Sequence, residues 1–198
     1  LLEEPGSLWN RLPGETRWKS AGLRALLCFM TAHPGKKLVF SGMESAEPDT
    51  QDAGVLRNFV RDLNRFYLET PALWEADFSR DGFAWLANDD CSNSILAFRR
   101  IGADEREVLA VCNFLPEKRE NYRVGVPEQG LYAEIFSSDR TEYGGSGVTN
   151  GNRLSSEAIA WNGFGQSVVL TLPPLSVVFL KCRRRGAKRK EQTGFSDA

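Results

Sequence analysis

The sequence has little of several features that mark common functional classes. Its 198 residues include one histidine and four cysteines, and no two cysteines have the CxxC spacing of zinc or redox motifs. A formal net charge of -1 gives no electrostatic basis for a nucleic-acid partner. The opening LLEEPGS is acidic rather than basic, unlike a signal peptide, and no later apolar run could span a bilayer. We therefore expect no nucleic acid, no membrane, no metal and no cofactor, and a cytoplasmic protein with reduced thiols.

The stretch 32–45, AHPGKKLVFSGMES, combines a helix end, a turn and an apolar run. Proline lacks the N–H that a continuing helix needs, and glycine accepts a left-handed cap, so the histidine, proline and glycine at 33–35 predict a helix end. Leu38–Phe40 is a continuous apolar run, which predicts a short strand buried on both faces. Glu44 follows at the expected carboxyl end of this strand, where α/β folds place binding residues.

Two helices are expected around this strand, after a loop at residues 1–16. Apolar residues recur at three- and four-residue spacing over 17–32 and again over 53–68. One strand cannot form a parallel sheet by itself, because each strand needs neighbours at its edges. The apolar faces around Trp18 and Leu56 are therefore expected to be uncovered, which predicts docking on missing barrel strands or self-association.

The rest of the chain predicts an antiparallel β-sandwich. Short apolar or alternating segments are separated by turn residues at intervals of about a dozen. The expected strands are 83–87, 94–101, 108–114, 120–125, 132–137, 154–160, 166–172 and 176–182. The tail at 183–198 contains RRRGAKRK and almost no apolar side chain, which predicts disorder.

Six motifs together resemble the carboxyl-terminal part of glycogen (1,4-alpha-glucan) branching enzymes of the α-amylase superfamily. They are PGSLWNRLPGE, LRALLCFMTAHPGKKLVFSGMES, RNFVRDLNRFYLETPAL, VLAVCNFLP, EYGGSGVTNG and LPPLSVVFLK. The resemblance implies a mixed α and β fold. Residues 1–77 would contain the last helix-strand-helix portion of a (β/α)8 barrel, residues 78–182 a carboxyl-terminal sandwich, and residues 183–198 a basic tail.

The same resemblance implies that no catalytic residue is present. These enzymes move α-1,4-linked glucan segments to α-1,6 branch points with a carboxylate nucleophile and a carboxylic acid about 5 Å apart. A third aspartate belongs to a His-Asp-Glu motif that would fall at or before the first residue here. The family's Gly-x-Glu-Phe-Gly-Gln corresponds to residues 42–47, where Glu44 is kept and its phenylalanine is not.

Four residues are candidates for contact with an α-glucan: Glu44, Trp74, Trp85 and Trp161. Each also has a simpler interpretation. Glu44 is at least as compatible with an ion pair, and aromatic residues more often fill a core than form a sugar platform. His33, in a helix-ending turn, is interpreted as structural rather than as a general base. The sequence thus predicts an inactive part of a branching enzyme in glycogen synthesis, or alternatively a non-catalytic glucan-binding or protein-interaction module.

Overall fold

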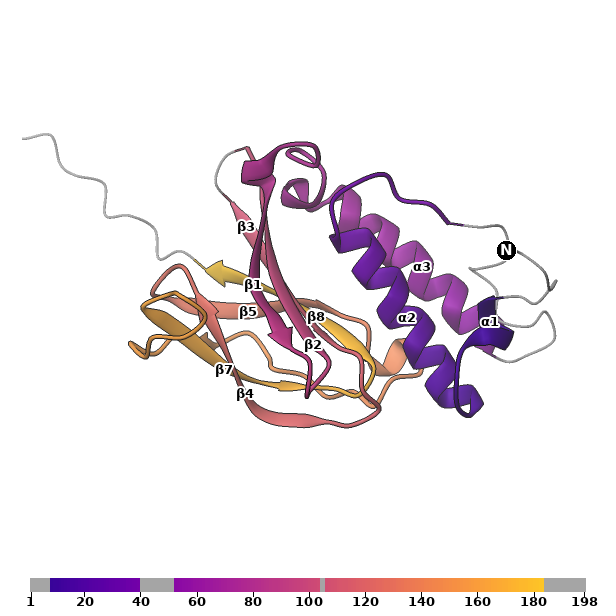
Figure 1. The fold of residues 1–198 in the computed structure, drawn as a ribbon. Helices are drawn as coiled ribbons and strands as arrows, with labels where there is room; N and C mark the ends of the chain where they lie inside the picture. Colours follow the sequence, from indigo (N-terminus) through magenta and orange to yellow (C-terminus); the bar gives the residue numbers. More distant parts are fainter. Residues whose placement is uncertain (1–7, 40–51, 104–105, 184–198) are drawn as a thin grey trace, which may run out of the picture.

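The computed structural model describes residues 8–39, 52–103 and 106–183. Its elements, with α for α-helices, η for 3-10 helices and β for strands, are α1 Leu8–Arg11, α2 Thr16–Ala32, α3 Asp52–Leu68, η1 Pro71–Leu73, η2 Arg80–Gly82, β1 Phe83–Asp90, β2 Ile95–Ile101, β3 Glu107–Asn113, β4 Arg119–Val126, β5 Leu131–Ser137, η3 Thr141–Tyr143, β6 Leu154–Ser155, β7 Gln166–Leu172 and β8 Ser176–Arg183. Figure 1 shows α2 and α3 side by side next to the strands.

The strands form two antiparallel sheets. The larger has six strands in the order β1-β2-β3-β8-β5-β6, and the smaller pairs β4 with β7. β3 lies between β2 and β8, in register from Leu109 opposite Leu180 to Asn113 opposite Ser176. The expected all-β carboxyl-terminal part is confirmed, apart from the strand over 154–160, which is limited to the two residues of β6.

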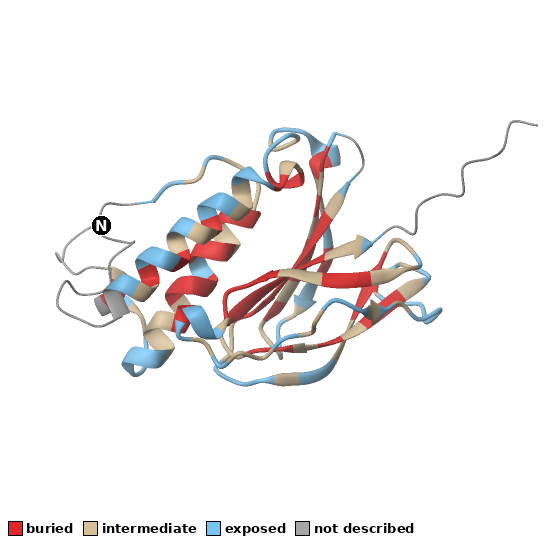
Figure 2. Ribbon diagram, turned by 180° about the vertical axis from the view of Figure 1, so that it is seen from behind, coloured by how far each residue is buried: buried red, intermediate tan, exposed pale blue. Residues whose placement is uncertain are grey.

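The six-stranded sheet is covered on both faces, so the fold has three layers. Successive strand residues point to opposite faces. Phe179 and Val177 of β8 belong to a core shared with the helices, whereas Val178 and Leu180 belong to a second core shared with β4 and β7. Figure 2 shows the buried residues concentrated where the helices meet the sheet and along its central strands.

The apolar faces of the helices are covered within this chain, which corrects the expectation that they need a partner. Leu56 is buried, and Trp18 of α2 is half-buried. Phe59 of α3 contacts Phe136 of β5 at a ring-centroid distance of 6.2 Å. Phe66 stacks on the same Phe136 ring at 4.8 Å. The sequence shows the apolar stripes but not their partner, and the sheet that follows them in the chain covers them.

Helix α2 ends as its sequence predicts. The His33 N–H donates to Phe29 O at 2.8 Å, and Gly35 has a φ of +107°. The buried strand predicted at Leu38–Phe40 is wrong for the part that can be tested: residues 36–39 form no strand, and Leu38 is 65% exposed. No described strand pairs with this segment, and an apolar run without neighbours has nothing to bury it. Phe40 lies outside the described residues.

Two smaller differences concern the ends of the chain. Part of the loop expected at residues 1–16 forms the short helix α1, in which Trp9 is buried against the helical core. Arg183 belongs to β8, and the rest of the basic tail lies outside the described residues. Among the helices of the described ranges, none has the length and apolar character needed to cross a membrane.

Candidate functional site

The loop between β6 and β7 presents an aromatic side chain on a tight hairpin. Trp161 and Phe164 exchange two backbone hydrogen bonds of 2.9 Å each. The two residues between them, Asn162 and Gly163, have φ values of +48° and +79°. Positive φ at both central positions characterises the type I′ hairpin turn, for which Asn-Gly is the preferred pair. The turn therefore forms because these two residues accept left-handed backbone angles.

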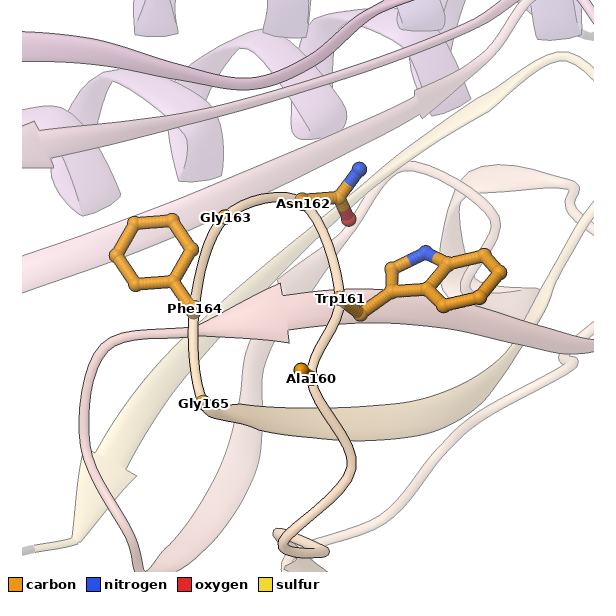
Figure 3. A pocket seen from close by; sticks show the side chains of 6 residues that line it. All are labelled: Ala160, Trp161, Asn162, Gly163, Phe164 and Gly165. Atoms are coloured by element: carbon orange, nitrogen blue, oxygen red, sulfur yellow. The ribbon is translucent and has the colours of Figure 1, made fainter.

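The hairpin rests directly on strand β4. The Gly125 N–H donates to Oδ1 of Asn162 at 2.9 Å. A Cβ atom at Gly125 would lie 2.1 Å from the Trp161 carbonyl oxygen, so only glycine allows this approach. In Figure 3 the Trp161 indole and the Phe164 ring extend from opposite sides of the loop, and residues 160–165 line an open hollow. Trp161 is 48% exposed on this fixed support.

Trp85 lies in a different environment, within a cluster of rings. Its indole packs edge-on against Phe83 at 5.0 Å and against Phe98 at 5.7 Å. The His33 ring lies 6.4 Å away and 5.5 Å from Phe83. The His33 ring also lies 6.3 Å from Phe98 of β2, so it joins the end of helix α2 to β1 and β2, which agrees with the structural role expected for it. Trp85 remains 41% exposed.

The four candidate residues do not assemble into one site within the part of the chain that the structure describes. Trp74 follows η1 and is 41% exposed, Trp85 is on β1, and Trp161 is on the hairpin. No ring contact joins these indoles within residues 8–39, 52–103 and 106–183. The expectation that they fill the core is wrong, because each keeps at least two fifths of its surface exposed. Glu44 lies outside the described residues.

A buried ion pair is the main feature that the sequence analysis missed. Arg100 of β2 is completely buried, and its Nη2 donates to Asp77 Oδ1 at 2.7 Å. Its Nη1 donates to the carbonyl of Ala32 at 2.6 Å, at the end of α2. The other Asp77 oxygen accepts from Gly35 N–H at 3.1 Å. This group fixes the chain just after α2, and no local sequence pattern indicates it.

The described residues offer little for metal or thiol chemistry. Within them, no group of three or more His, Cys, Asp or Glu side chains could hold a metal ion. All four cysteines are free thiols. Burial raises the pKa of both the Cys28 and the Cys112 thiol, so neither is a thiolate nucleophile at neutral pH.

The part of the chain that forms the two sheets matches the model of a known protein family. Residues 85–183, half of the 198-residue chain, match the model "Alpha amylase, C-terminal all-beta domain". The chain belongs to this family. The match covers every strand except the first two residues of β1 and includes the hairpin of Trp161.

Curated relatives of this family member are branching enzymes. The 1,4-alpha-glucan branching enzyme GlgB of Aromatoleum aromaticum is 43% identical over 189 residues, which cover 88% of this chain and 30% of the relative. GlgB of Rubrobacter xylanophilus is 44% identical over 198 residues, covering 92% of this chain and 27% of the relative. The chain thus spans less than a third of the length of these relatives.

A solved structure extends the likeness to the helices. A crystal structure of a MUTB mutant, from crystals soaked with trehalulose, superimposes with a TM-score of 0.55 at 15% sequence identity. The superposition covers 84% of this chain and 39% of the other. The helices and sheets together are therefore a known arrangement.

Proposed function

We propose that this chain is a non-catalytic part of an α-1,4-glucan branching protein. The observation that carries the proposal is the 43–44% identity to curated branching enzymes, which extends over 88–92% of the chain and so includes helices as well as sheets. Identity of this extent supports a shared role in glycogen synthesis, as well as a shared fold. A cytoplasmic location is part of the proposal and is consistent with four free thiols.

The helical part is proposed to be the end of a (β/α)8 barrel. Leu38 and Val39 are 65% and 44% exposed and have no strand partner among the described residues. An apolar run of this kind is stable as a barrel strand only when neighbouring strands flank it. The proposal therefore places further strands of a longer protein, or of a separate one, beside Leu38 and Val39.

Catalysis is proposed to depend on carboxylates outside this chain. Retaining glucan transfer needs a nucleophile and an acid about 5 Å apart. Several buried or half-buried carboxylates of the described residues already have structural partners: Asp77 binds Arg100, Asp139 binds Ser146, and Asp90 binds Tyr122. These carboxylates hold loops and strands together.

The test is complementation. The R. xylanophilus branching enzyme would be truncated to remove its segment homologous to this chain, and branching of amylose would be measured as α-1,6 linkages released by isoamylase. We expect the truncated enzyme to be inactive, the present chain alone to form no α-1,6 linkages, and the mixture to recover activity. New linkages from the chain alone would overturn the non-catalytic assignment. A mixture that stays inactive while both proteins are folded would overturn the supporting role.

A second candidate function is glucan binding by the isolated chain. It is favoured by the exposure of Trp74, Trp85 and Trp161, because an exposed indole has an apolar face and a polar N–H, as sugar binding requires. Glu44 remains a proposed sugar contact. Calorimetric titration of the full chain with maltoheptaose tests this function, and saturable binding is expected. No heat at millimolar ligand would leave only the role as a structural part.

A further inference from the structure

The hairpin that carries Trp161 presents two exposed apolar side chains. Ile159 and Trp161 are 47% and 48% exposed and lie two positions apart in one loop. Exposed large apolar side chains that are adjacent on a surface commonly mark a contact site. Neither side chain is needed to close the hairpin, since the backbone bonds between Trp161 and Phe164 do so.

The hairpin is built to hold the indole in one place. Asn162 is fixed through its Oδ1 to Gly125, and the Ser167 hydroxyl donates to the Ile159 carbonyl at 2.8 Å. Glu157 is paired with Ser167 by two backbone hydrogen bonds of 2.8 and 3.0 Å. A side chain presented on a rigid support loses little conformational freedom when it binds a ligand, and this increases affinity.

Asn162, the next residue in the hairpin, provides a polar side chain near the indole. The Oδ1 of Asn162 is used by Gly125, whereas its Nδ2 carries two donor hydrogens. In Figure 3 this amide and the indole nitrogen of Trp161 lie on the same side of the loop. Arg123 and Glu157 form an ion pair of 2.7 Å on the neighbouring surface. A flat apolar face with donors at its edge matches a pyranose ring, whose C–H groups lie on the ring faces and whose hydroxyls project from its rim.

We propose that the Trp161 hairpin is the glucan contact of this chain, with a pyranose ring of an α-1,4-glucan stacked on the indole and Asn162 Nδ2 donating to a sugar hydroxyl. This inference rests on the proposed glucan-binding function and assigns it to one of the three exposed tryptophans. The glucan is chosen over a protein partner because the relatives' names specify 1,4-alpha-glucan as the substrate.

The other two tryptophans are less suited to this role. Trp85 contacts the rings of Phe83 and Phe98 and is somewhat less exposed than Trp161, so less of its ring is free for a sugar. Trp74 follows a three-residue 3-10 helix, with irregular backbone angles of φ -141° and ψ -25°. Phe78, which is 85% exposed and is not one of the candidates for glucan contact, is the control.

The experiment compares four forms of the full chain: wild type, Trp161→Ala, Trp161→Phe and Phe78→Ala. Each is titrated calorimetrically with maltoheptaose and with cellohexaose, and folding is checked by thermal unfolding. We expect Trp161→Ala to raise the Kd for maltoheptaose at least tenfold, Trp161→Phe to raise it less, and Phe78→Ala to leave it within twofold. In the wild type, the cellohexaose Kd should be at least tenfold higher than the maltoheptaose Kd.

The titrations distinguish a failure of the Trp161 assignment from a failure of the glucan-binding function on which it rests. If the wild type binds maltoheptaose and Trp161→Ala binds equally well, the hairpin assignment is overturned while glucan binding stands. Equal weakening by Trp161→Ala and Phe78→Ala also overturns it, since binding would then be spread over the surface. Equal affinity for cellohexaose overturns the choice of an α-linked ligand. A wild type that binds neither sugar overturns both the site and the glucan-binding function, but not the supporting role tested by complementation.

Discussion

Arg100 donates to Asp77 across 2.7 Å, and the arginine side chain has no exposed surface. The two residues are 23 positions apart, one on β2 and the other in the turn before η2. Through the carbonyls of Ala32 and Gly82, the same guanidinium also joins the end of α2 to the start of β1. One side chain thus links the helical layer to the six-stranded sheet.

Replacing Arg100 by methionine should be strongly destabilising. Asp77 and two carbonyl groups would keep their buried positions without their donor, and removing one partner of a buried ion pair costs about 3–5 kcal/mol. Urea unfolding measures this loss of free energy. Arg17→Met is the matched control, because Arg17 is 71% exposed and 3.6 Å from Glu15, so its change should be below about 1 kcal/mol. Equal losses in the two variants would contradict the role of Arg100.

Phe59 tests whether the helices and the sheet share one core. Its ring is fully buried, with Tyr143 at 5.1 Å and Phe136 at 6.2 Å. Phe59→Ala should lower the free energy of unfolding by about 3–5 kcal/mol, the usual cost for a buried phenylalanine. Leu68, on the same helix and 70% exposed, provides the control, and Leu68→Ala should change stability by about 0.5 kcal/mol or less. A small effect of Phe59→Ala would mean that α3 is not packed as described.

Gly125→Ala should displace the Trp161 hairpin from β4. The added methyl group would meet the Trp161 carbonyl at 2.1 Å, and overpacking of this kind costs about 1–3 kcal/mol. Near-ultraviolet circular dichroism should show an altered tryptophan signal. Gly165→Ala is the control, because nothing lies within 4 Å of a Cβ there. An unchanged signal in Gly125→Ala would show that the loop accommodates the methyl group without moving.

Alkaline pH should reveal the environment of Tyr143. Burial and the nearby Asp62 carboxylate raise the pKa of this phenol to about 12. An unfolded tyrosine has a pKa of about 10, so its stabilising effect is complete below pH 10 and is lost as the pH rises toward 12. Over that interval the unfolding free energy should fall by about 1.4 kcal/mol per pH unit from this group alone.

Unfolding experiments between pH 9 and pH 12 measure this slope against the variant Tyr143→Phe. Burial also raises the pKa of Tyr67, Tyr122 and Tyr132, so the wild-type slope includes all four tyrosines. The variant should show a slope that is less steep by the contribution of one group. An identical slope in the two proteins would show that Tyr143 titrates as an exposed phenol does.

Local patterns in the sequence predicted most secondary structure. The spacing of apolar residues places α2 and α3 within one residue of their observed bounds, and alternation with turn residues locates the main strands. These patterns work because helix and strand periodicity are properties of a few consecutive residues. The strand predicted at Leu38–Phe40 is different: whether an apolar run forms a strand depends on neighbours that its own residues do not specify.

The tertiary contacts of the site were harder to predict from the sequence. The Arg100–Asp77 pair joins positions with no common motif, and a charged residue in a strand is ordinarily assigned to the surface. Asn162-Gly163 does indicate a hairpin turn, but such a turn favours a strand on each side of it and so does not reveal that the strand expected over 154–160 has only two residues. The exposure of Trp161 could not have been found in this way, because aromatic residues in strands and hairpins are more often packed.

Because both faces of the six-stranded sheet are covered, the sheets depend on the helices whenever the gene is rearranged. A gene rearrangement that joined residues 78–183 to a new partner without α2 and α3 would place Phe98, Phe136 and Phe179 in water. Each such ring costs about 1.5–3 kcal/mol when it is exposed. The helix pair and the sheets are therefore expected to move between genes together, as one evolutionary unit. This holds even though apolar residues recur with helical spacing in one part and in short strand segments in the other.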